Sequence, residues 1–199
     1  RDHAGSGAHL HVSLVDANGQ NVFAAEDPAG SPALRHAIGG LAATINDSMA
    51  VCAPTANSYR RFQPEAYVPL SPSWSVNNRG VAFRVPHGPP ASRRVEHRVA
   101  GAEANPYLLA AMVLAGMHLG ITRKLDPGPV LAGNAYRDAT PTIPLTWAEA
   151  LTAFEQSAFA REYLGERFTR LYTQTRRGEM QDFSSYVSPL EFSWYLTTS

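Results

Sequence analysis

The sequence has almost no lysine and no net charge. Lys124 is the only lysine among 199 residues, and 17 lysine and arginine residues balance 17 aspartate and glutamate residues. A neutral chain exerts no long-range attraction on nucleic acid or on an anionic membrane, so we expect neither as a partner. Nearly all the positive charge is guanidinium, which suits bidentate contacts with carboxylate and phosphate. Any anion site must therefore come from local clusters of arginine.

The sequence is also poor in cysteine. It has no long apolar run, and it does not begin with a conventional N-terminal segment. Cys52 is the only cysteine, which excludes an internal disulfide framework and is typical of a reducing compartment. No apolar run approaches the roughly 20 residues needed to span a bilayer. The opening residues, RDHAGSG, contain neither an initiator methionine nor a signal-peptide pattern. We therefore expect a cytoplasmic protein, and a chain that is a piece of a longer one.

Alternating apolar residues predict strands over 8–15, 80–85 and 93–99. Residues 54–80 are rich in Pro, Ser and Asn and are expected to form an ordered loop. A loop this long inside a domain is usually functional. A connector rich in Pro and Gly covers residues 126–144.

Apolar residues at three- and four-residue spacing predict the helices. The segments with this spacing are 32–53, 105–123 and 158–176. Thr146 with Glu149 predicts a capping box for a further helix that begins at Trp147. The aromatic tail, YVSPLEFSWYL, is expected to pack rather than to extend freely.

Two histidines suggest a binding face on the first strand. His9 and His11 are two residues apart, so both side chains project from the same face. Such a pair can offer two imidazoles to a metal or a phosphate, but two ordinary polar residues give the same pattern. The Gly5-Ser6-Gly7 run before them permits close approach of the backbone to a ligand, or forms a plain turn.

Arginines gather around one carboxylate on the last predicted strand. Arg94, Glu96 and Arg98 alternate on one face, which is also the pattern of a solvated, salt-bridged strand. One carboxylate among so many guanidinium groups is unfavourable unless anions or a metal complete the arrangement. The other arginines of these strands and the neighbouring loop are Arg60, Arg61, Arg79, Arg84 and Arg93. The group predicts a site for phosphate and carboxylate groups.

Four motifs, in order, resemble the C-terminal half of the glutamine synthetase catalytic domain. They are GSGAHLHVS, NSYRRFQP, NNRGVAFRVP and RRVEHRVAGAEANPYL, and VSPLEFSWYL closes the chain. The resemblance covers essentially the whole chain, and four ordered motifs are far more specific than any one alone. It implies an α+β fold in which a curved antiparallel sheet lines the active site and helices pack outside, as in glutamine synthetases and guanidino kinases. It also implies that residues 1–199 lack the N-terminal domain and the first part of the catalytic domain.

The resemblance implies a role for each matching position. His9 and Glu96 match ligands of one active-site divalent metal, Mg²⁺ or Mn²⁺. The positions that match residues at ATP are His11, Ser13, Arg84 and Arg94. Those that match residues around the substrate glutamate are Gly5, Arg61, Arg79 and Arg98. Arg79 also matches an arginine near the transferring phosphoryl group and is the expected catalytic residue.

Three positions depart from the family pattern. Ala4-Gly5 stands where ammonia-using members have Asn-Gly. Tyr67 stands where many members have a glutamate that closes the site and helps to deprotonate ammonium, while Glu65 is a carboxylate two residues away. Ala91 stands where many members have a lysine near the nucleotide. The first two departures remove groups that serve ammonia and leave the residues for ATP, metal and glutamate in place.

The expected function is therefore ATP-dependent ligation of the glutamate γ-carboxyl group to an alkyl amine or polyamine, through γ-glutamyl phosphate. The departures place the chain nearest the γ-glutamylpolyamine synthetase branch, with a homo-oligomeric ring as the full-length assembly. An ammonia-using glutamine synthetase is the alternative within the class. A catalytically inactive scaffold and a nucleotide-binding fragment are alternatives of another class. We expect the isolated chain to be inactive, because half of the family's metal ligands precede the histidine motif.

Overall fold

Two long helices form the centre of the molecule. The structure, a computed structural model, describes residues 5–64 and 66–196. Helix α1 (Pro32–Cys52) begins at Ser31, whose side chain accepts a hydrogen bond from a backbone N–H of the first turn. Helix α2 (Pro106–Arg123) begins in the same way, with a proline at its first position. Both helices confirm the prediction from apolar spacing.

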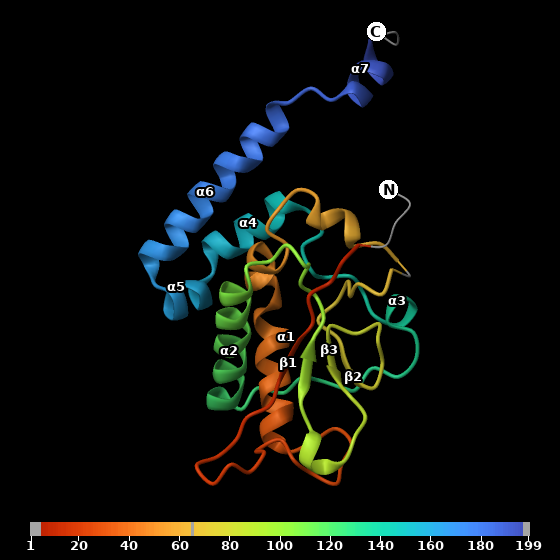
Figure 1. Ribbon diagram of the computed structural model, residues 1–199, viewed down its shortest axis with the longest axis vertical. Helices are drawn as coiled ribbons and strands as arrows, with labels where there is room; N and C mark the ends of the chain where they lie inside the picture. Colours follow the sequence, from red (N-terminus) through yellow and green to blue (C-terminus); the bar gives the residue numbers. More distant parts are fainter. Residues whose placement is uncertain (1–4, 65, 197–199) are drawn as a thin grey trace.

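Glycines allow α1 and α2 to pack with their backbones in contact. A Cβ atom added to Gly40 would overlap the carbonyl oxygen of Gly116, and one added to Gly120 would overlap the backbone of α1. The two helices lie side by side along much of their length (Figure 1). No helix in the described part of the chain combines the length and the apolar character that crossing a membrane requires.

A short four-stranded sheet lies in front of α1 in the view of Figure 1. Its strands, in chain order, are β1 (Leu10–Val12), β2 (Trp74–Val76), β3 (Phe83–Val85) and β4 (Val95–His97). Their order across the sheet is β1-β4-β3-β2, and β4 pairs antiparallel with both of its neighbours. The predicted α+β class is confirmed.

The prediction of a wholly antiparallel sheet is wrong at one edge. β2 runs parallel to β3, with Trp74 beside Phe83 in the register. Asn77, at the end of β2, has the left-handed backbone angle φ = 57°. Residues 77–82 carry the chain back so that β3 starts level with β2. The three residues of β2 are too short a run to stand out from the predicted loop over 54–80.

Alternation within β3 and β4 separates an apolar face from a charged one. Phe83, Val85 and Val95 are fully buried in the hydrophobic core that includes α1. Arg84 and Glu96 alternate with them and are paired across the sheet. Because successive side chains of a strand point to opposite faces, the charged side chains lie on the face away from the core.

Short helical turns interrupt the segments predicted as loops. A 3₁₀ turn covers Ser58–Arg61 within the predicted loop 54–80, and another covers Pro90–Ser92 between β3 and β4. Helix α3 (Ala135–Asp138) lies within the connector 126–144. Composition alone gives no helical period over so few residues.

The C-terminal third is helical. Thr146 and Glu149 form the predicted capping box of α4 (Trp147–Gln156). The predicted helix over 158–176 is two helices, α5 (Ala158–Leu164) and α6 (Glu166–Ser185), because Gly165 has φ = 84° and ends the first of them. A residue in that left-handed region cannot continue an α-helix.

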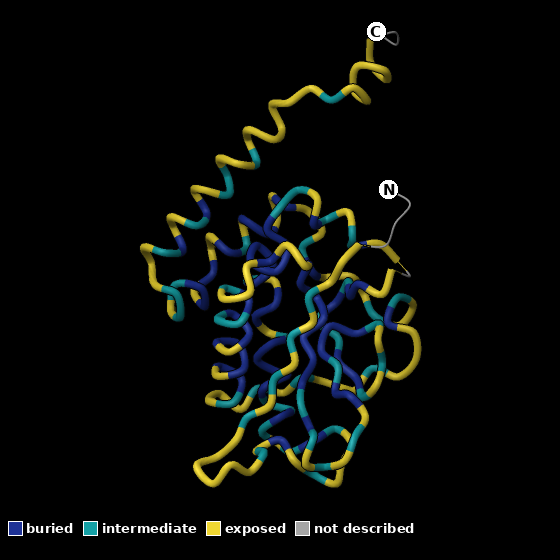
Figure 2. Tube along the Cα trace, viewed as in Figure 1, coloured by how far each residue is buried: buried dark blue, intermediate teal, exposed yellow. Residues whose placement is uncertain are grey.

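The prediction that the aromatic tail packs is wrong for the described residues, whose side chains are exposed. The first part of α6 is held to the core, since the Tyr172 hydroxyl donates to the Ala50 carbonyl at 2.9 Å and Arg177 donates to Glu155 of α4. The C-terminal part of α6 extends away from the core (Figure 1). Helix α7 (Pro189–Tyr195) lies at its far end and is exposed (Figure 2). Phe192 and Tyr195 are 59% and 64% exposed. The aromatic composition of this segment predicts packing, but it does not predict the surface against which the rings would pack.

Candidate active site

Strand register assembles the predicted site on the charged face of the sheet. His11 on β1 lies directly opposite Glu96 on β4, and Arg84 on β3 lies opposite the same residue. Opposite residues of antiparallel strands share a face, and so do residues two apart on one strand. His9 and Arg98 therefore join this face, as the alternation in the sequence predicts.

Glu96 is the centre of the cluster. Its Oε1 atom accepts a hydrogen bond from Nη1 of Arg98 at 2.6 Å, and its Oε2 atom accepts one from Nη1 of Arg84 at 2.7 Å. Nδ1 of His9 lies 3.2 Å from Oε1, which confirms the predicted approach of these two residues. The Glu96 side chain is only 4% exposed. Both of its oxygens are thus held in fixed positions.

The surroundings set the charge of both candidate metal ligands. Burial alone would raise the pKa of Glu96, but the hydrogen bonds and charges of Arg84 and Arg98 outweigh it and hold that pKa below its usual range. Burial and the Arg98 guanidinium lower the pKa of His9. The site therefore keeps a carboxylate next to a neutral imidazole, which are the protonation states that a metal ligand needs.

A cavity of about 470 Å³ opens over this cluster. We call it the central cavity, and the residues that line it are His9, Tyr67, Arg79, Arg84, Glu96 and Arg98. Five of these six were predicted site residues, and Tyr67 was the position singled out as a departure from the family pattern. The volume is within the range of small-molecule sites.

The predicted nucleotide residues lie beside the central cavity. Arg94 Nε donates to Nδ1 of His11 at 3.2 Å, and His11 Nε2 lies 3.8 Å from Glu96. Arg84, which lines the cavity, also donates from Nη2 to the side-chain oxygen of Asn77 at 2.7 Å. Ser13 is exposed and lies two residues beyond His11, just past the end of β1.

Gly5 and Arg61 form a separate contact outside the lining of the central cavity. A Cβ atom added to Gly5 would lie 2.5 Å from Cγ of Arg61, so only glycine fits here. Nη2 of Arg61 donates to the carbonyl of Ala100 at 3.2 Å. Its Nε and Nη1 are buried without a hydrogen-bond partner among the described residues. Unpaired buried donors are costly, and the Glu103 carboxylate is the neighbouring opposite charge that acts on Arg61.

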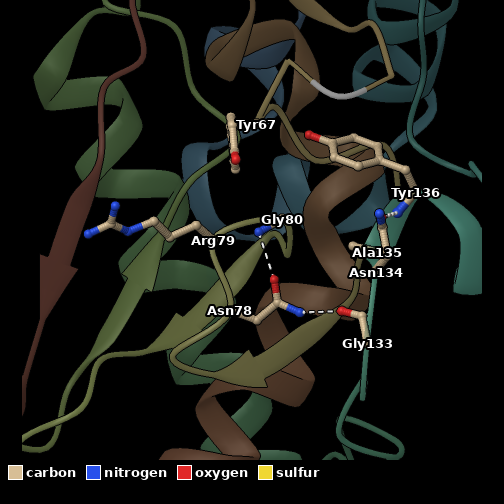
Figure 3. A pocket seen from close by; sticks show the side chains of 8 residues that line it. All are labelled: Tyr67, Asn78, Arg79, Gly80, Gly133, Asn134, Ala135 and Tyr136. Carbon is tan, nitrogen blue, oxygen red and sulfur yellow. Dashed lines mark hydrogen bonds between the residues drawn. The ribbon is translucent and has the colours of Figure 1, made fainter.

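A second cavity, also of about 470 Å³, adjoins the central one. We call it the side cavity, and its lining residues are Tyr67, Asn78, Arg79, Gly80, Gly133, Asn134, Ala135 and Tyr136 (Figure 3). Tyr67 and Arg79 line both cavities. Residues 133–136 were not predicted as site residues, because nothing in a local pattern links them to Tyr67.

Ala4 and Glu65, which were named where the sequence departs from the family pattern, lie outside the described residues. Tyr67 itself is 67% exposed and has φ = 55°, an unusual angle for an aromatic residue. Strained backbone of this kind collects at functional positions. Ala91 lies in the 3₁₀ turn over Pro90–Ser92, and its carbonyl accepts a hydrogen bond from Asn21.

The donors present suit part of a metal site. His9 offers an imidazole and Glu96 a carboxylate, and both are ligand types that bind Mg²⁺ or Mn²⁺. Within 5–64 and 66–196, no group of three or more His, Cys, Asp or Glu side chains is placed to hold a metal ion. The described residues therefore fit two positions of a coordination shell and leave the others to further ligands.

The fold and the cavity together define an α+β domain in which one carboxylate, Glu96, is paired with two arginines in the lining of a cavity. Comparison with known proteins gives the family. Residues 1–195 match the model of the glutamine synthetase catalytic domain. The chain belongs to the glutamine synthetase family.

Individual relatives agree with this assignment. The chain is 40% identical over 195 residues to γ-glutamylputrescine synthetase of Escherichia coli, covering 98% of this chain and 41% of that protein. It is 36% identical over 189 residues to γ-glutamylethanolamide synthetase of Streptomyces coelicolor, covering 94% and 40%. The solved structure of apo GmaS superposes with a TM-score of 0.86 at 29% identity, covering 97% of this chain and 45% of that one. The chain thus spans less than half the length of these relatives.

Proposed function

We propose that the full-length protein containing this chain is an ATP-dependent ligase that joins the γ-carboxyl group of glutamate to an alkyl amine. In this reaction an oxygen of the γ-carboxylate attacks the γ-phosphorus of ATP and ADP leaves. The amine nitrogen then attacks the acyl carbon of γ-glutamyl phosphate, the C–O bond to phosphate breaks, and the nitrogen loses a proton. The products are the γ-glutamyl amide, ADP and phosphate.

The cluster around Glu96 supports the phosphoryl-transfer step. Catalysis of this step depends on positioning and on stabilising charge that spreads over the transferring oxygens. Arg79, Arg84 and Arg98 bring three guanidinium groups to the lining of one cavity. Glu96 holds two of them in place through its two carboxylate oxygens. Their remaining N–H groups can then meet an anion without further ordering.

We assign roles to the other predicted residues on the same reasoning. His9 and Glu96 would hold one Mg²⁺ or Mn²⁺, which would neutralise charge on the phosphates. His11, Ser13, Arg84 and Arg94 would contact ATP along the edge formed by β1 and β4. Gly5, Arg61, Arg79 and Arg98 would surround glutamate.

The observation that carries the choice of amine is the position of Tyr67. Ammonium must lose a proton before it attacks, so a site for ammonia benefits from a carboxylate near the acyl phosphate. Tyr67 lines the central cavity where many family members have that carboxylate. A phenol with an ordinary pKa of about 10 is a poor base at neutral pH. Its ring can instead pack on the methylene groups of an alkyl amine or contact a cation.

An amine competition tests this proposal. Ammonia, 1-aminobutane and 1,4-diaminobutane are offered together with ATP and glutamate to the full-length enzyme, and the amide products are quantified. We expect an alkyl amide to dominate, and Tyr67→Ala to lower kcat/KM for alkyl amines more than for ammonia. Preferential formation of glutamine, abolished by Glu65→Gln but not by Tyr67→Phe, would instead support the ammonia-using alternative.

We also propose that the full-length protein assembles into a homo-oligomeric ring. The exposed apolar side chains of α7 support an interface there, because contiguous apolar surface of this kind usually contacts a partner. Phe192, Tyr195 and Leu196 line one shallow groove. Light scattering of the full-length protein at several concentrations tests the assembly, and a monomer at all of them would contradict it.

A further inference from the structure

Tyr67 and Arg79 are the two residues that line both cavities, and both are exposed. Burial in the core therefore does not fix the position of either side chain. Residues 133–136, which we call the bracing segment, form the part of the side cavity that lies at the right in Figure 3, while Arg79 lies at the left. This segment contacts the chain neighbours of both exposed residues.

The bracing segment holds the loop of Tyr67 through Val68. The Tyr136 hydroxyl donates to the Val68 carbonyl at 3.3 Å, and the Val68 side chain is buried in the core. Burial raises the pKa of Tyr136, and the backbones of Tyr67 and Val68 oppose that rise. Tyr136 thus lies against the two residues at which the chain passes from the exposed surface into the core.

This contact supports an unfavourable backbone angle. Tyr67 has φ = 55°, in the left-handed region that is strained for a residue with a Cβ atom. Such an angle persists only where the surrounding structure holds it. The next residue, Val68, is fixed through both its side chain and its carbonyl group. Without the Tyr136 hydroxyl, Tyr67 should relax toward an ordinary angle and its ring should leave the lining that the two cavities share.

The bracing segment also contacts both chain neighbours of Arg79. The Asn78 side chain donates to the Gly133 carbonyl at 2.9 Å and accepts from the N–H of Gly80 at 2.9 Å (Figure 3). A Cβ atom added to Gly80 would lie only 3.2 Å from the Cβ atom of Ala135. The backbone on either side of Arg79 is therefore packed against one short segment, which fixes the point from which the guanidinium group extends.

The connector that contains the bracing segment is itself fixed at both ends. Before the segment, the N–H of Leu131 donates to the Trp74 carbonyl of β2 at 2.9 Å, and the Leu131 carbonyl accepts from the Ser75 hydroxyl at 2.8 Å. After it, the N–H of Thr142 donates to the Leu70 carbonyl at 3.0 Å. The segment is thus anchored to the sheet and to the loop that carries Tyr67.

We propose that the bracing segment positions Tyr67 and Arg79 for ligation, with Tyr136 acting through Val68 and Asn78 acting on Arg79. Tyr136 then influences the choice of amine, because the Tyr67 ring is the group that packs on an alkyl chain. Asn78 influences kcat, because Arg79 stabilises the transferring phosphoryl group. This inference rests on the proposed amine ligase activity and adds two positioning residues to it.

The first test removes the Tyr136 hydroxyl alone, by Tyr136→Phe in the full-length enzyme. We expect the ratio of kcat/KM for 1-aminobutane to that for ammonia to fall about fivefold, the size of one hydrogen bond between neutral groups. The same substitution in a Tyr67→Ala enzyme should leave the ratio unchanged, because the effect of Tyr136 passes through the Tyr67 ring. A general loss of structure would instead lower both rates in both backgrounds.

The second test concerns Arg79. Asn78→Ala should lower kcat about tenfold with the KM for ATP unchanged, and it should cause no further loss in an Arg79→Ala enzyme. Tyr163→Phe is the matched control for both tests. It removes a hydroxyl that is hydrogen-bonded to Nδ1 of His118 at 2.8 Å, from a half-buried tyrosine of α5, and should change neither quantity.

The outcomes separate this inference from the proposed function. The bracing role is overturned if Tyr136→Phe keeps the amine ratio of the parent or if Asn78→Ala keeps its kcat. It is also overturned if either loss persists at full size after Tyr67 or Arg79 has been replaced. A parent enzyme that forms no amide from 1-aminobutane would overturn the proposed function itself.

Discussion

His9, which directly precedes β1, and Glu96 on the adjacent strand β4 approach one another, with 3.2 Å between Nδ1 of the histidine and Oε1 of the glutamate. The same oxygen accepts a hydrogen bond from Arg98, and the other oxygen accepts one from Arg84. The pair of candidate metal ligands is therefore part of the network that orients the arginines. A change at Glu96 should affect stability as well as catalysis.

Replacing Glu96 with glutamine should destabilise the protein. The substitution removes the counter-charge of two guanidinium groups that are only 6% and 14% exposed, and breaking a buried pair from one side costs about 3 kcal/mol. Urea denaturation of both proteins measures the difference. Glu155→Gln removes the exposed partner of Arg177 and should cost less than about 1 kcal/mol. Equal losses in the two variants would contradict the central role of Glu96.

Replacing Gly5 with alanine should impair glutamate binding. The added methyl group would lie 2.5 Å from Cγ of Arg61 and would push that side chain from its place. We expect the KM for glutamate to rise at least severalfold, with little change in the melting temperature. Gly178→Ala, in a part of α6 where nothing lies within 4 Å, is the control and should not change this KM. An unchanged KM for glutamate in Gly5→Ala would show that the position of Arg61 does not matter for glutamate binding.

Replacing Arg79 with alanine should lower kcat of the full-length enzyme far more than it weakens ATP binding. An arginine that stabilises charge developing during phosphoryl transfer is worth about 10³-fold in rate, on the order of 4 kcal/mol. Steady-state kinetics and nucleotide titration give the two quantities. Arg60→Ala changes an exposed arginine whose Nη1 donates to Asn57, and it should alter neither. Equal losses in kcat and ATP affinity in Arg79→Ala would mark a residue that binds substrate and transition state alike.

The isolated 199-residue chain should show no metal-dependent ADP release with glutamate and an amine. Its described residues offer His9 and Glu96 as candidate ligands, and both oxygens of Glu96 already accept hydrogen bonds from arginines. Phosphoryl transfer needs the complete coordination of its metal ions. A coupled assay with Mn²⁺ or Mg²⁺ measures ADP, with the full-length enzyme as the positive control. Robust turnover by the chain alone would mean that it carries a whole site.

Local patterns in the sequence predicted the parts of this molecule that local forces determine. Apolar spacing gave α1 and α2, and alternation placed His9, His11 and Glu96 on common faces, because these patterns follow from helix and strand geometry. The parallel edge of the sheet depends on the backbone angle of Asn77. The amino-acid composition around Asn77 does not predict that backbone angle.

The side cavity and the exposed tail could not be predicted in this way. Tyr67 and Tyr136 line one cavity only because the loop that carries Tyr67 lies beside α3, and no periodicity relates positions so far apart. The aromatic residues of α7 favour apolar contact, which is why packing of the tail was predicted. In the described residues these side chains are exposed, so the composition of the segment alone did not give its place.

The measurement that tests the central claim most directly follows an oxygen atom from glutamate. If the γ-carboxylate attacks ATP and the amine later displaces phosphate, one carboxylate oxygen leaves with that phosphate. The full-length enzyme is therefore supplied with glutamate labelled with ¹⁸O in its γ-carboxylate, together with ATP and 1,4-diaminobutane, and the phosphate is examined by mass spectrometry. The account predicts one ¹⁸O atom in each phosphate released. Phosphate without the label, formed at the same rate as the amide, would contradict ligation through γ-glutamyl phosphate.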